Sequence, residues 1–243
     1  MSEILKGISS MATRQVLAEL CQACERAIGM PVRFESVGGV DAARRVQAGQ
    51  IFDLVVLAAD AIVELAATGH VIADSRRTIV ESSVAMAVRA DAKRPDIGSE
   101  EALRRTVLAA RRIGYSTGPS GTALLKLFER WGLSETLRDR LVQAKPGLPV
   151  AALIASGQVE LGFQQYSELK NQDGIALLGT MPPGLEIVTT FVGAVGAGSA
   201  RNAAARATLS FMSSPSTAEI KRRHGLAPAS GGGDALFPDQ PTT

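Results

Sequence analysis

The sequence alternates between short apolar, β-branched runs and longer segments in which apolar residues recur with a helical period. Short runs of the first kind are typical of strands, and the helical period is typical of helices that pack on one face. The alternation continues to about residue 224. Because a crossover helix is needed to place two neighbouring strands parallel, this pattern predicts mostly parallel sheets flanked by helices, an α/β fold.

The expected elements follow from these periods and from the Pro and Gly positions between them. The expected strands are 3–8, 31–36, 53–57, 79–89, 112–115, 159–164, 175–178 and 186–195, and the expected helices are 12–28, 40–49, 60–68, 99–110, 121–131, 134–140, 149–156, 199–213 and 215–224. Strands 79–89 and 186–195 are the longest, so we expect them to be hinge strands between two lobes. Lobe one is then 1–78 plus 192–243, and lobe two is 83–187.

Charge and hydropathy exclude several classes of partner. Lys and Arg number 26 against 24 Asp and Glu, and they are spread along the chain, so we expect no nucleic-acid partner. No window reaches the roughly 18–20 apolar residues of a membrane span, so we expect no membrane insertion. The N-terminus lacks a leader pattern. The sequence as it stands predicts a cytoplasmic protein, or a periplasmic one if a signal peptide has been removed.

Cys21 and Cys24 form the only cysteine pair, with C-x-x-C spacing. A redox pair of this kind needs a helix N-terminus, where the thiol pKa is lowered, whereas these residues fall in the middle of a predicted helix. Their spacing matches that of Val16, Leu17 and Leu20, which predicts two core side chains. Without a second Cys/His pair we expect no metal site, and nothing in the sequence indicates a cofactor.

Small polar residues cluster where two predicted strands lead into helices. Ser9 and Ser10 follow the first strand, and a denser group follows the strand that ends near Tyr115. That group comprises Ser116, Thr117, Gly118, Ser120 and Gly121. A helix N-terminus presents unpaired N–H groups and a partial positive charge, so both segments predict anion binding. Because they fall in different lobes, we expect one ligand in the cleft between the lobes.

Segments along nearly the whole chain resemble one family. The segments are "GISSM", "VRFESVGG" with "AARRVQAGQIFDLVVLAAD", "IGYSTGPSGTALLKLFERWGL", "ALIASGQVELGFQQYSEL" and "FVGAVGAGSARNAAARATLSFMSSPSTAEIKRRHGLAPA". In order and spacing they are similar to the type II periplasmic solute-binding proteins, in particular the molybdate-binding branch and its aconitate-isomerase-like members. The resemblance implies a two-lobed fold, each lobe a mostly parallel sheet flanked by helices, joined by two hinge strands.

The resemblance also implies a set of ligand-binding positions. They are Ser9, Ser10, Gly38, Gly39, Ser116 to Gly121 (Ser116, Thr117, Gly118, Ser120 and Gly121 above all), Gln164, Gln165 and Tyr166. The chain departs from the molybdate pattern in the second loop, where it has Gly38-Gly39 in place of serines. It departs again after the later strand, where Gln165 takes the place of a tyrosine. A carboxylate ligand suits glycine amides and a glutamine NH₂ as well as an oxyanion does.

Three functions therefore remain open. The first is a solute-binding module for a small anion, an oxyanion or a di- or tricarboxylate, with an ABC-transporter permease as partner if the protein is exported. The second is a cytoplasmic isomerase of an unsaturated tricarboxylate on the same fold, for which Glu168, Tyr166 and the serines are the available acid–base groups. No residue carries a catalytic signature of its own. The third is a sensor domain, although no DNA-binding segment precedes Glu3.

Two further groups have a structural and a functional interpretation. Ser82 and Ser83 lie on the predicted hinge strand 79–89, where they either face solvent or reach the cleft. The basic run Lys221-Arg222-Arg223, followed by His224, predicts the exposed last turn of a helix.

Overall fold

The computed structural model describes residues 4–145 and 147–228. It is an α/β fold whose packing divides the chain into two compact units. Unit 1 comprises residues 1–36, 42–81 and 190–243, and unit 2 comprises 37–41 and 82–189, each as far as it is described. The two longest strands each run from one unit into the other. Their action as a hinge stays a prediction, and the Gly/Pro-rich end of the chain from Ser230 lies outside the described residues.

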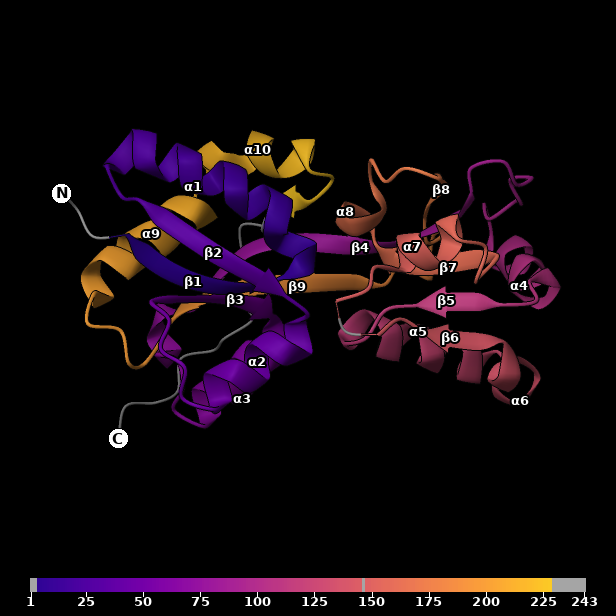
Figure 1. Cartoon of the computed structure of the whole chain (residues 1–243), viewed down its shortest axis with the longest axis horizontal. Helices are drawn as coiled ribbons and strands as arrows, with labels where there is room; N and C mark the ends of the chain where they lie inside the picture. Colours follow the sequence, from indigo (N-terminus) through magenta and orange to yellow (C-terminus); the bar gives the residue numbers. More distant parts are fainter. Residues whose placement is uncertain (1–3, 146, 229–243) are drawn as a thin grey trace. The chain divides into compact units, whose positions relative to one another are not determined.

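Unit 1 is built on a mixed sheet with the strand order β2-β1-β3-β9-β4. Its strands are β1 (Leu5–Ser10), β2 (Val32–Val37), β3 (Leu54–Ala58), β4 (Arg77–Arg89), β9 (Val188–Val195) and β10 (Ala227–Pro228). Its helices are α1 (Arg14–Ile28), α2 (Gly39–Gln47), α3 (Ala59–Ala67), α9 (Asn202–Ser213) and α10 (Ala218–Arg223), with 3-10 turns at Met11–Thr13, Ala73–Ser75 and Pro215–Thr217. Helices α1 and α10 lie on one side of strands β1 to β3, and α2 and α3 lie on the other (Figure 1).

Unit 2 continues from β4 in the strand order β4-β7-β5-β6, with β8 also paired to β4. Its other strands are β5 (Ile113–Tyr115), β6 (Leu141–Gln143), β7 (Leu161–Gln165) and β8 (Ile175–Thr180). Its helices are α4 (Glu100–Ala109), α5 (Pro119–Arg130), α6 (Ser134–Leu137), α7 (Val150–Ala155) and α8 (Tyr166–Leu169), with a 3-10 turn at Arg138–Arg140. Strands β5 and β7 are parallel, with Tyr115 opposite Phe163, so the segments that follow them start from the same edge of the sheet.

Each unit has its own apolar core. In unit 1 the helical stripe of α1, which includes Val16, Leu20 and Cys24, packs with Leu54 of β3. This helix ends at Gly29, whose φ of 64° is the left-handed conformation that glycine adopts without strain. In unit 2 the rings of Phe128 and Phe163 meet edge to face with centroids 6.0 Å apart. Helix α5 is thereby anchored on strand β7.

The sequence-based elements agree with this structure apart from the shortest ones and the sheet polarity. Strands β6 and β10 and helix α8 were not predicted, since two to four residues carry no measurable period. Residues 134–140 form α6 and a 3-10 turn rather than one helix. The sheets are more mixed than expected, because β9 runs antiparallel to β3, and β4 runs antiparallel to both β7 and β8.

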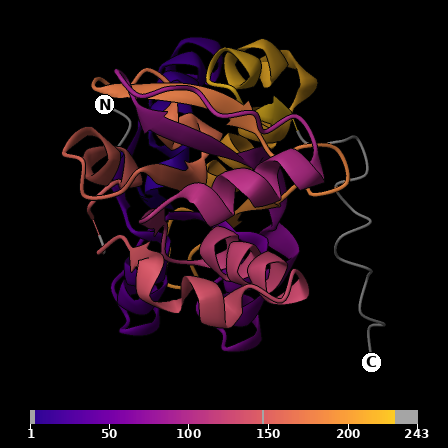
Figure 2. The ribbon, with the colours of Figure 1, turned by 90° about the vertical axis from the view of Figure 1, so that its right-hand side faces the viewer.

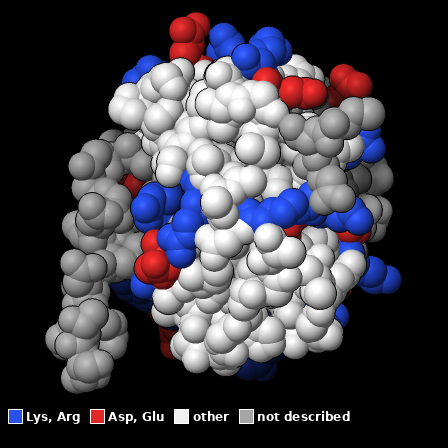
Figure 3. All heavy atoms as spheres, turned by 90° about the vertical axis from the view of Figure 1, so that its left-hand side faces the viewer, with Lys and Arg blue, Asp and Glu red and all other residues white. Residues whose placement is uncertain are grey.

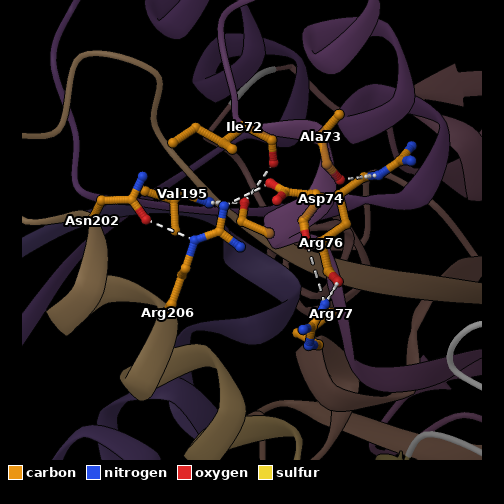
Figure 4. A network of polar contacts seen from close by, with 9 residues as sticks. Ile72, Ala73, Asp74, Arg76, Arg77, Val195, Asn202 and Arg206 are labelled. Carbon is orange, nitrogen blue, oxygen red and sulfur yellow. Dashed lines mark hydrogen bonds and ion pairs between the residues drawn. The ribbon is translucent and has the colours of Figure 1, made fainter. Parts of the chain in front are cut away.

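A polar network fastens the turn before β4 to the rest of unit 1 (Figure 4). Arg206 of α9 donates to Asp74 over 2.6 Å and to Asn202 over 2.7 Å. The backbone N–H of Val195 in β9 donates to the Ser75 hydroxyl over 2.8 Å. The start of β4 is therefore held by two elements that lie more than a hundred residues further along the chain.

The charges do not form one broad basic field on the face drawn in Figure 3. Lys and Arg side chains form a short band there with Asp and Glu beside it, and much of the face is uncharged. Within the described ranges, no helix combines the length and the apolar character that crossing a bilayer requires.

The prediction of an exposed basic run at the end of α10 was wrong for its first residue. Arg222 and Arg223 are exposed, but Lys221 is fully buried and its Nζ has no hydrogen-bond partner in the described part of the chain. Burial lowers the pKa of Lys221 to about 8. The helical period turns this position toward α1 and the core, so the run is split between the interior and the surface.

Replacing Lys221 by methionine is expected to raise the free energy of unfolding at pH 7 by about 1–3 kcal/mol, the cost of an unpaired buried polar group. Because the pKa in the folded state is about 8, against an ordinary value of 10.5, the native protein releases this proton first. The stability of the unaltered chain should therefore rise between pH 8 and 10.5, and that rise should vanish in Lys221→Met. Urea unfolding at several pH values measures both effects. Arg222→Met, at an exposed neighbouring position, is the control, and parallel profiles for all three proteins would contradict the assignment.

Candidate functional site

The carboxyl ends of β1 and β2 bring three serines together in unit 1. Ser9 is fully buried, and its hydroxyl lies 2.9 Å from that of Ser36, which is on β2. The Ser10 hydroxyl accepts a hydrogen bond from the Ala12 N–H over 3.4 Å and so caps the 3-10 turn that leads into α1. The pair of predicted serines is thus split, one facing Ser36 and the other serving as a helix cap.

Ser36 was not singled out from the sequence. The available signal was its position at the end of an alternating strand, directly before the Gly38-Gly39 pair. Gly38 has no positive φ, and a Cβ added there would meet no atom within 4 Å. Neither backbone strain nor packing against the described residues requires a glycine at this position. Gly38 directly precedes α2, where glycine suits a helix start, and close approach of another molecule to the bare backbone is a second physical reason for it. Gly39 opens α2.

The segment from Ser116 to Gly121 forms a tight elbow between β5 and α5 in unit 2. Gly118 precedes the helix with a φ of 91°, and Pro119 occupies its first turn. The Ser116 and Ser120 hydroxyls lie 3.1 Å apart. A Cβ on Gly121 would stand only 2.0 Å from the Ser116 carbonyl oxygen, so a larger residue there would push the elbow apart. The elbow therefore presents hydroxyls and small residues at the start of a 12-residue helix.

Thr117 and Thr122 complete this segment. Thr117, which lies between Ser116 and Ser120 in sequence, is half-buried. The Thr122 hydroxyl donates to the Gly118 carbonyl over 3.3 Å. The Thr122 backbone N–H donates to the same carbonyl over 3.1 Å. These bonds hold the first turn of α5 closed while Ser120, although buried, keeps its hydroxyl directed at Ser116.

Gln164 and Gln165 point to opposite faces of β7, as adjacent residues in a strand must. Gln164 accepts from the Val150 N–H over 2.9 Å and donates to Glu168 over 2.9 Å. Gln165 donates from Nε2 to the Thr189 hydroxyl over 2.7 Å. Tyr166 begins α8 and packs against the cluster that contains Val150. The three adjacent polar residues therefore do not form one group.

Gln165, its partner Thr189 and Ser82 are buried polar residues of unit 2. Val84 lies opposite Gln165 in the β4–β7 register, and Ser82, two residues earlier on β4, projects from the same face as Val84. Ser82 Oγ and Gln165 Oε1 are both buried and have no partner among residues 4–145 and 147–228. Buried polar atoms are nearly always paired in native proteins, so two such atoms on one face are what a ligand-binding position presents. Thr189 was not expected from the sequence.

Glu168 is the titratable group on this edge of unit 2 with the most altered pKa. It lies on α8, directly after β7, and it is partly buried. Burial raises its pKa to about 7, and the hydrogen bond from Gln164 opposes the rise only in part. A carboxyl group with this pKa exchanges protons near neutral pH, as a general base or acid requires.

The cysteines show no reactive character. Cys24 is buried and Cys21 is half-buried in the middle of α1, which confirms the prediction of core side chains. Burial, with a smaller contribution from the neighbouring Cys24, raises the pKa of the Cys21 thiol to about 12. Among the described residues, no group of three or more His, Cys, Asp and Glu side chains is arranged to hold a metal ion.

Comparison with known proteins places this geometry in context. The model of the family described as bacterial extracellular solute-binding protein matches residues 5–227. A curated relative, an aconitate isomerase of a Pseudomonas species, is 34% identical over 230 residues, which span 92% of this chain and 87% of the relative.

Solved structures give the same assignment of fold. The periplasmic molybdate-binding protein of Azotobacter vinelandii has a TM-score of 0.76 at 18% identity, over 93% of this chain and 100% of that one. The sulfate-binding protein of Mycobacterium tuberculosis has a TM-score of 0.76 at 16% identity, over 98% of this chain and 92% of that one. The match to the family model and the extent of these similarities lead to one assignment: the chain belongs to the bacterial extracellular solute-binding protein family and has its type II periplasmic-binding-protein fold.

Proposed function

We propose that this protein binds a small organic di- or tricarboxylate through hydroxyl and amide donors of unit 2. The observation that carries the proposal is the pair of unpartnered buried atoms, Ser82 Oγ and Gln165 Oε1, on the β4–β7 face of unit 2. The elbow from Ser116 to Gly121 starts from the same edge of that sheet. Further proposed donors lie near the carboxyl ends of β1 and β2. They are the hydroxyls of Ser9 and Ser36 and the backbone N–H groups at Gly38 and Gly39. In an exported form of the protein, the ligand would pass to an ABC-transporter permease.

The donor set suits a carboxylate. Hydroxyls and backbone amides hydrogen-bond an anion without a formal countercharge, as the helix N-terminus of α5 does. The Gln165 amide can turn over, because the Thr189 hydroxyl both accepts and donates. Thr189 would then donate to Oε1, and the Gln165 NH₂ would take the open position as a donor toward the ligand.

A second function, isomerisation of an unsaturated tricarboxylate, is favoured by Glu168 and by the 34% identical aconitate isomerase. The step we propose is a proton shift. Glu168, as the carboxylate, takes a proton from the ligand's CH₂ carbon. The electron pair of that C–H bond forms a new double bond to the central carbon, and the π pair of the old double bond moves to the far alkene carbon. The proton returns to the far alkene carbon, so that one C–H bond breaks, another forms, and the double bond moves by one position. No oxidant, reductant or cofactor takes part.

The neighbouring residues would make this shift possible in two ways. Hydroxyl and amide donors on the ligand's carboxylates stabilise the negative charge that develops when the proton leaves. Gln164 donates a hydrogen bond to Glu168 and accepts one from the Val150 N–H, and these bonds fix the position of the acid–base group relative to β7. General acid–base catalysis of this kind contributes typically about 10²–10⁴-fold in rate.

A thermal-shift panel tests the binding proposal. We expect citrate, cis-aconitate or trans-aconitate to raise the melting temperature in a concentration-dependent way, and molybdate, tungstate, sulfate and phosphate to do so less. The double variant Ser116→Ala/Ser120→Ala removes two donors to a charged group and should weaken binding by about 10-fold or more. Ser134→Ala, at an exposed position of the same unit, is the matched control. No shift with any carboxylate would overturn the proposal.

Turnover separates the two functions. Any carboxylate that shifts the melting temperature is followed by its ultraviolet absorbance, which changes when a conjugated double bond changes geometry or position. A steady change with cis- or trans-aconitate would support the isomerase. Binding without any change in absorbance would restrict the function to carboxylate binding.

A further inference from the structure

Unit 2 has a hollow at the ends of its strands that lie opposite the proposed carboxylate site. It has a volume of about 640 Å³ and is lined by residues of β4, the loop after it, α4 and the start of β7. Leu161 lines it at the amino end of β7, whereas the proposed carboxylate site is at the carboxyl end, beyond Gln165. None of the predicted ligand-binding residues lines it. Figure 2 shows unit 2 from the side on which α4 lies.

The floor of this hollow is apolar and its rim is charged. Val88, Ala102, Ala110, Val159 and Leu161 contribute the buried apolar floor. Four cations, Arg89, Lys93, Arg105 and Arg111, line the hollow together with the carboxylates of Asp96 and Glu160. Two of these cations pair with carboxylates beside the hollow, Arg89 with Asp91 over 2.5 Å and Arg105 with Glu101 over 2.8 Å. The volume falls in the usual range of small-molecule sites, which have mostly apolar walls and a few charged groups.

The carboxylates on the rim are already engaged. Glu160 pairs with Arg111 over 2.6 Å, and this partner keeps the pKa of Glu160 below its usual range. Asp96 accepts from the Gly98 N–H over 2.9 Å. Lys93, in contrast, is exposed and has no hydrogen bond or ion pair with any residue in the described ranges. This unpaired ammonium beside an apolar floor favours an occupant that carries an anionic group.

The walls are held in place without a ligand. The Thr106 hydroxyl of α4 donates to the Asp96 carbonyl over 2.9 Å, which ties the loop to the helix. The Arg111 N–H donates to Glu160 over 2.8 Å, which ties the end of α4 to the start of β7. A hollow that is already formed costs little ordering free energy when it binds.

We propose that this hollow, named here the α4 groove, is a second binding site that takes a small organic anion with an apolar body, such as an aromatic or branched-chain carboxylate or sulfonate. The apolar body would cover the Ala102, Ala110 and Leu161 floor, and the anionic group would pair with Lys93. Helix α4 couples the groove to the single tryptophan of the chain, because the Trp131 indole N–H donates to Glu100 over 2.6 Å.

The test uses anilinonaphthalene sulfonate as the probe, because it combines an aromatic body with a sulfonate and fluoresces when it leaves water. We expect saturable binding to the folded protein, with energy transfer from Trp131. Lys93→Glu and Ala109→Phe, which reverse the free charge and fill the groove, should each weaken binding by at least about 10-fold, equivalent to about 1.4 kcal/mol. Lys126→Glu is the matched control, because it makes the same charge change at an exposed position on α5 outside the groove.

The same experiment distinguishes the groove from the carboxylate site. Saturating trans-aconitate or citrate should leave probe binding unchanged, and Ser116→Ala/Ser120→Ala should bind the probe normally. Equal losses in Lys93→Glu and Lys126→Glu, or full displacement of the probe by the tricarboxylates, would overturn the proposal. Circular dichroism on each variant confirms that the fold is retained, so that a loss of binding reports on the groove.

Discussion

Replacing Asp53 by alanine is expected to lower the free energy of unfolding by about 3–5 kcal/mol, the range for breaking a buried ion pair. Asp53 is only 5% exposed and lies directly before β3. Its Oδ2 accepts from Arg201 over 2.7 Å and from the Lys6 N–H over 2.8 Å, and its Oδ1 accepts from Ser199 over 2.7 Å. The substitution leaves a cavity beside the Arg201 guanidinium and removes the carboxylate that accepts from Arg201, the Lys6 N–H and Ser199.

Denaturant unfolding monitored by circular dichroism measures this loss. Asp139→Ala, an exposed carboxylate in the other unit, should change stability by less than about 0.5 kcal/mol and serves as the control. Ser199→Ala removes one neutral donor and should cost about 1 kcal/mol. Equal stabilities for Asp53→Ala and Asp139→Ala would show that the Arg201 pair contributes nothing to the fold.

If the protein is an isomerase, Glu168→Gln is expected to lower kcat by about 10²–10⁴-fold, because a glutamine amide cannot accept the proton. The tricarboxylate-induced thermal shift should persist, since the variant keeps the shape of the side chain and its contact with Gln164. In the unaltered protein kcat/KM should rise with pH through about 7, the pKa that burial gives Glu168. Steady-state kinetics between pH 5 and 9 measure the profile.

The pH dependence of the free energy of unfolding tests the pKa of Glu168 independently of the kinetics. The pKa of Glu168 is raised from 4.5 to about 7 in the folded state, so the native protein holds this proton more tightly than the unfolded chain. The stability that this group contributes is complete below pH 4.5 and is lost as the pH rises through 7. Glu168→Gln should remove that loss. Glu129→Gln, exposed on α5, is the control. If the free energies of unfolding of Glu168→Gln and of the unaltered protein depended on pH in the same way, Glu168 would not have the raised pKa and would be excluded as the base.

Much of the fold was predictable from local pattern. The apolar stripe of α1 and the glycine at its end specify a helix of that length, and the structure has it at Arg14–Ile28. The elbow from Ser116 to Gly121 was equally predictable from the sequence, because Gly, Ser and Pro at a strand–helix junction act through local backbone geometry. In both cases the residues that determine the structure are neighbours in sequence.

The polar groups of the candidate site were only partly predictable. The sequence marked Gln164 and Gln165 as one cluster, yet strand geometry sends one side chain to Glu168 and the other to Thr189. Ser36 and Thr189 join the polar groups only through neighbouring strands. Register across a sheet depends on which strands pair, and no local pattern specifies that.

By itself, the sequence determined the order of helices and strands, the α/β class and the two small-residue turns, because these follow from hydrophobic period and from the backbone preferences of Gly, Ser and Pro. Only the tertiary structure decided that Asp53 pairs with Arg201, 148 residues away, that Lys221 is buried, and that Glu168 has a pKa near 7. Burial, charge pairing and pKa depend on which distant segments exclude water from a side chain, and those segments come together only when each unit packs its own core.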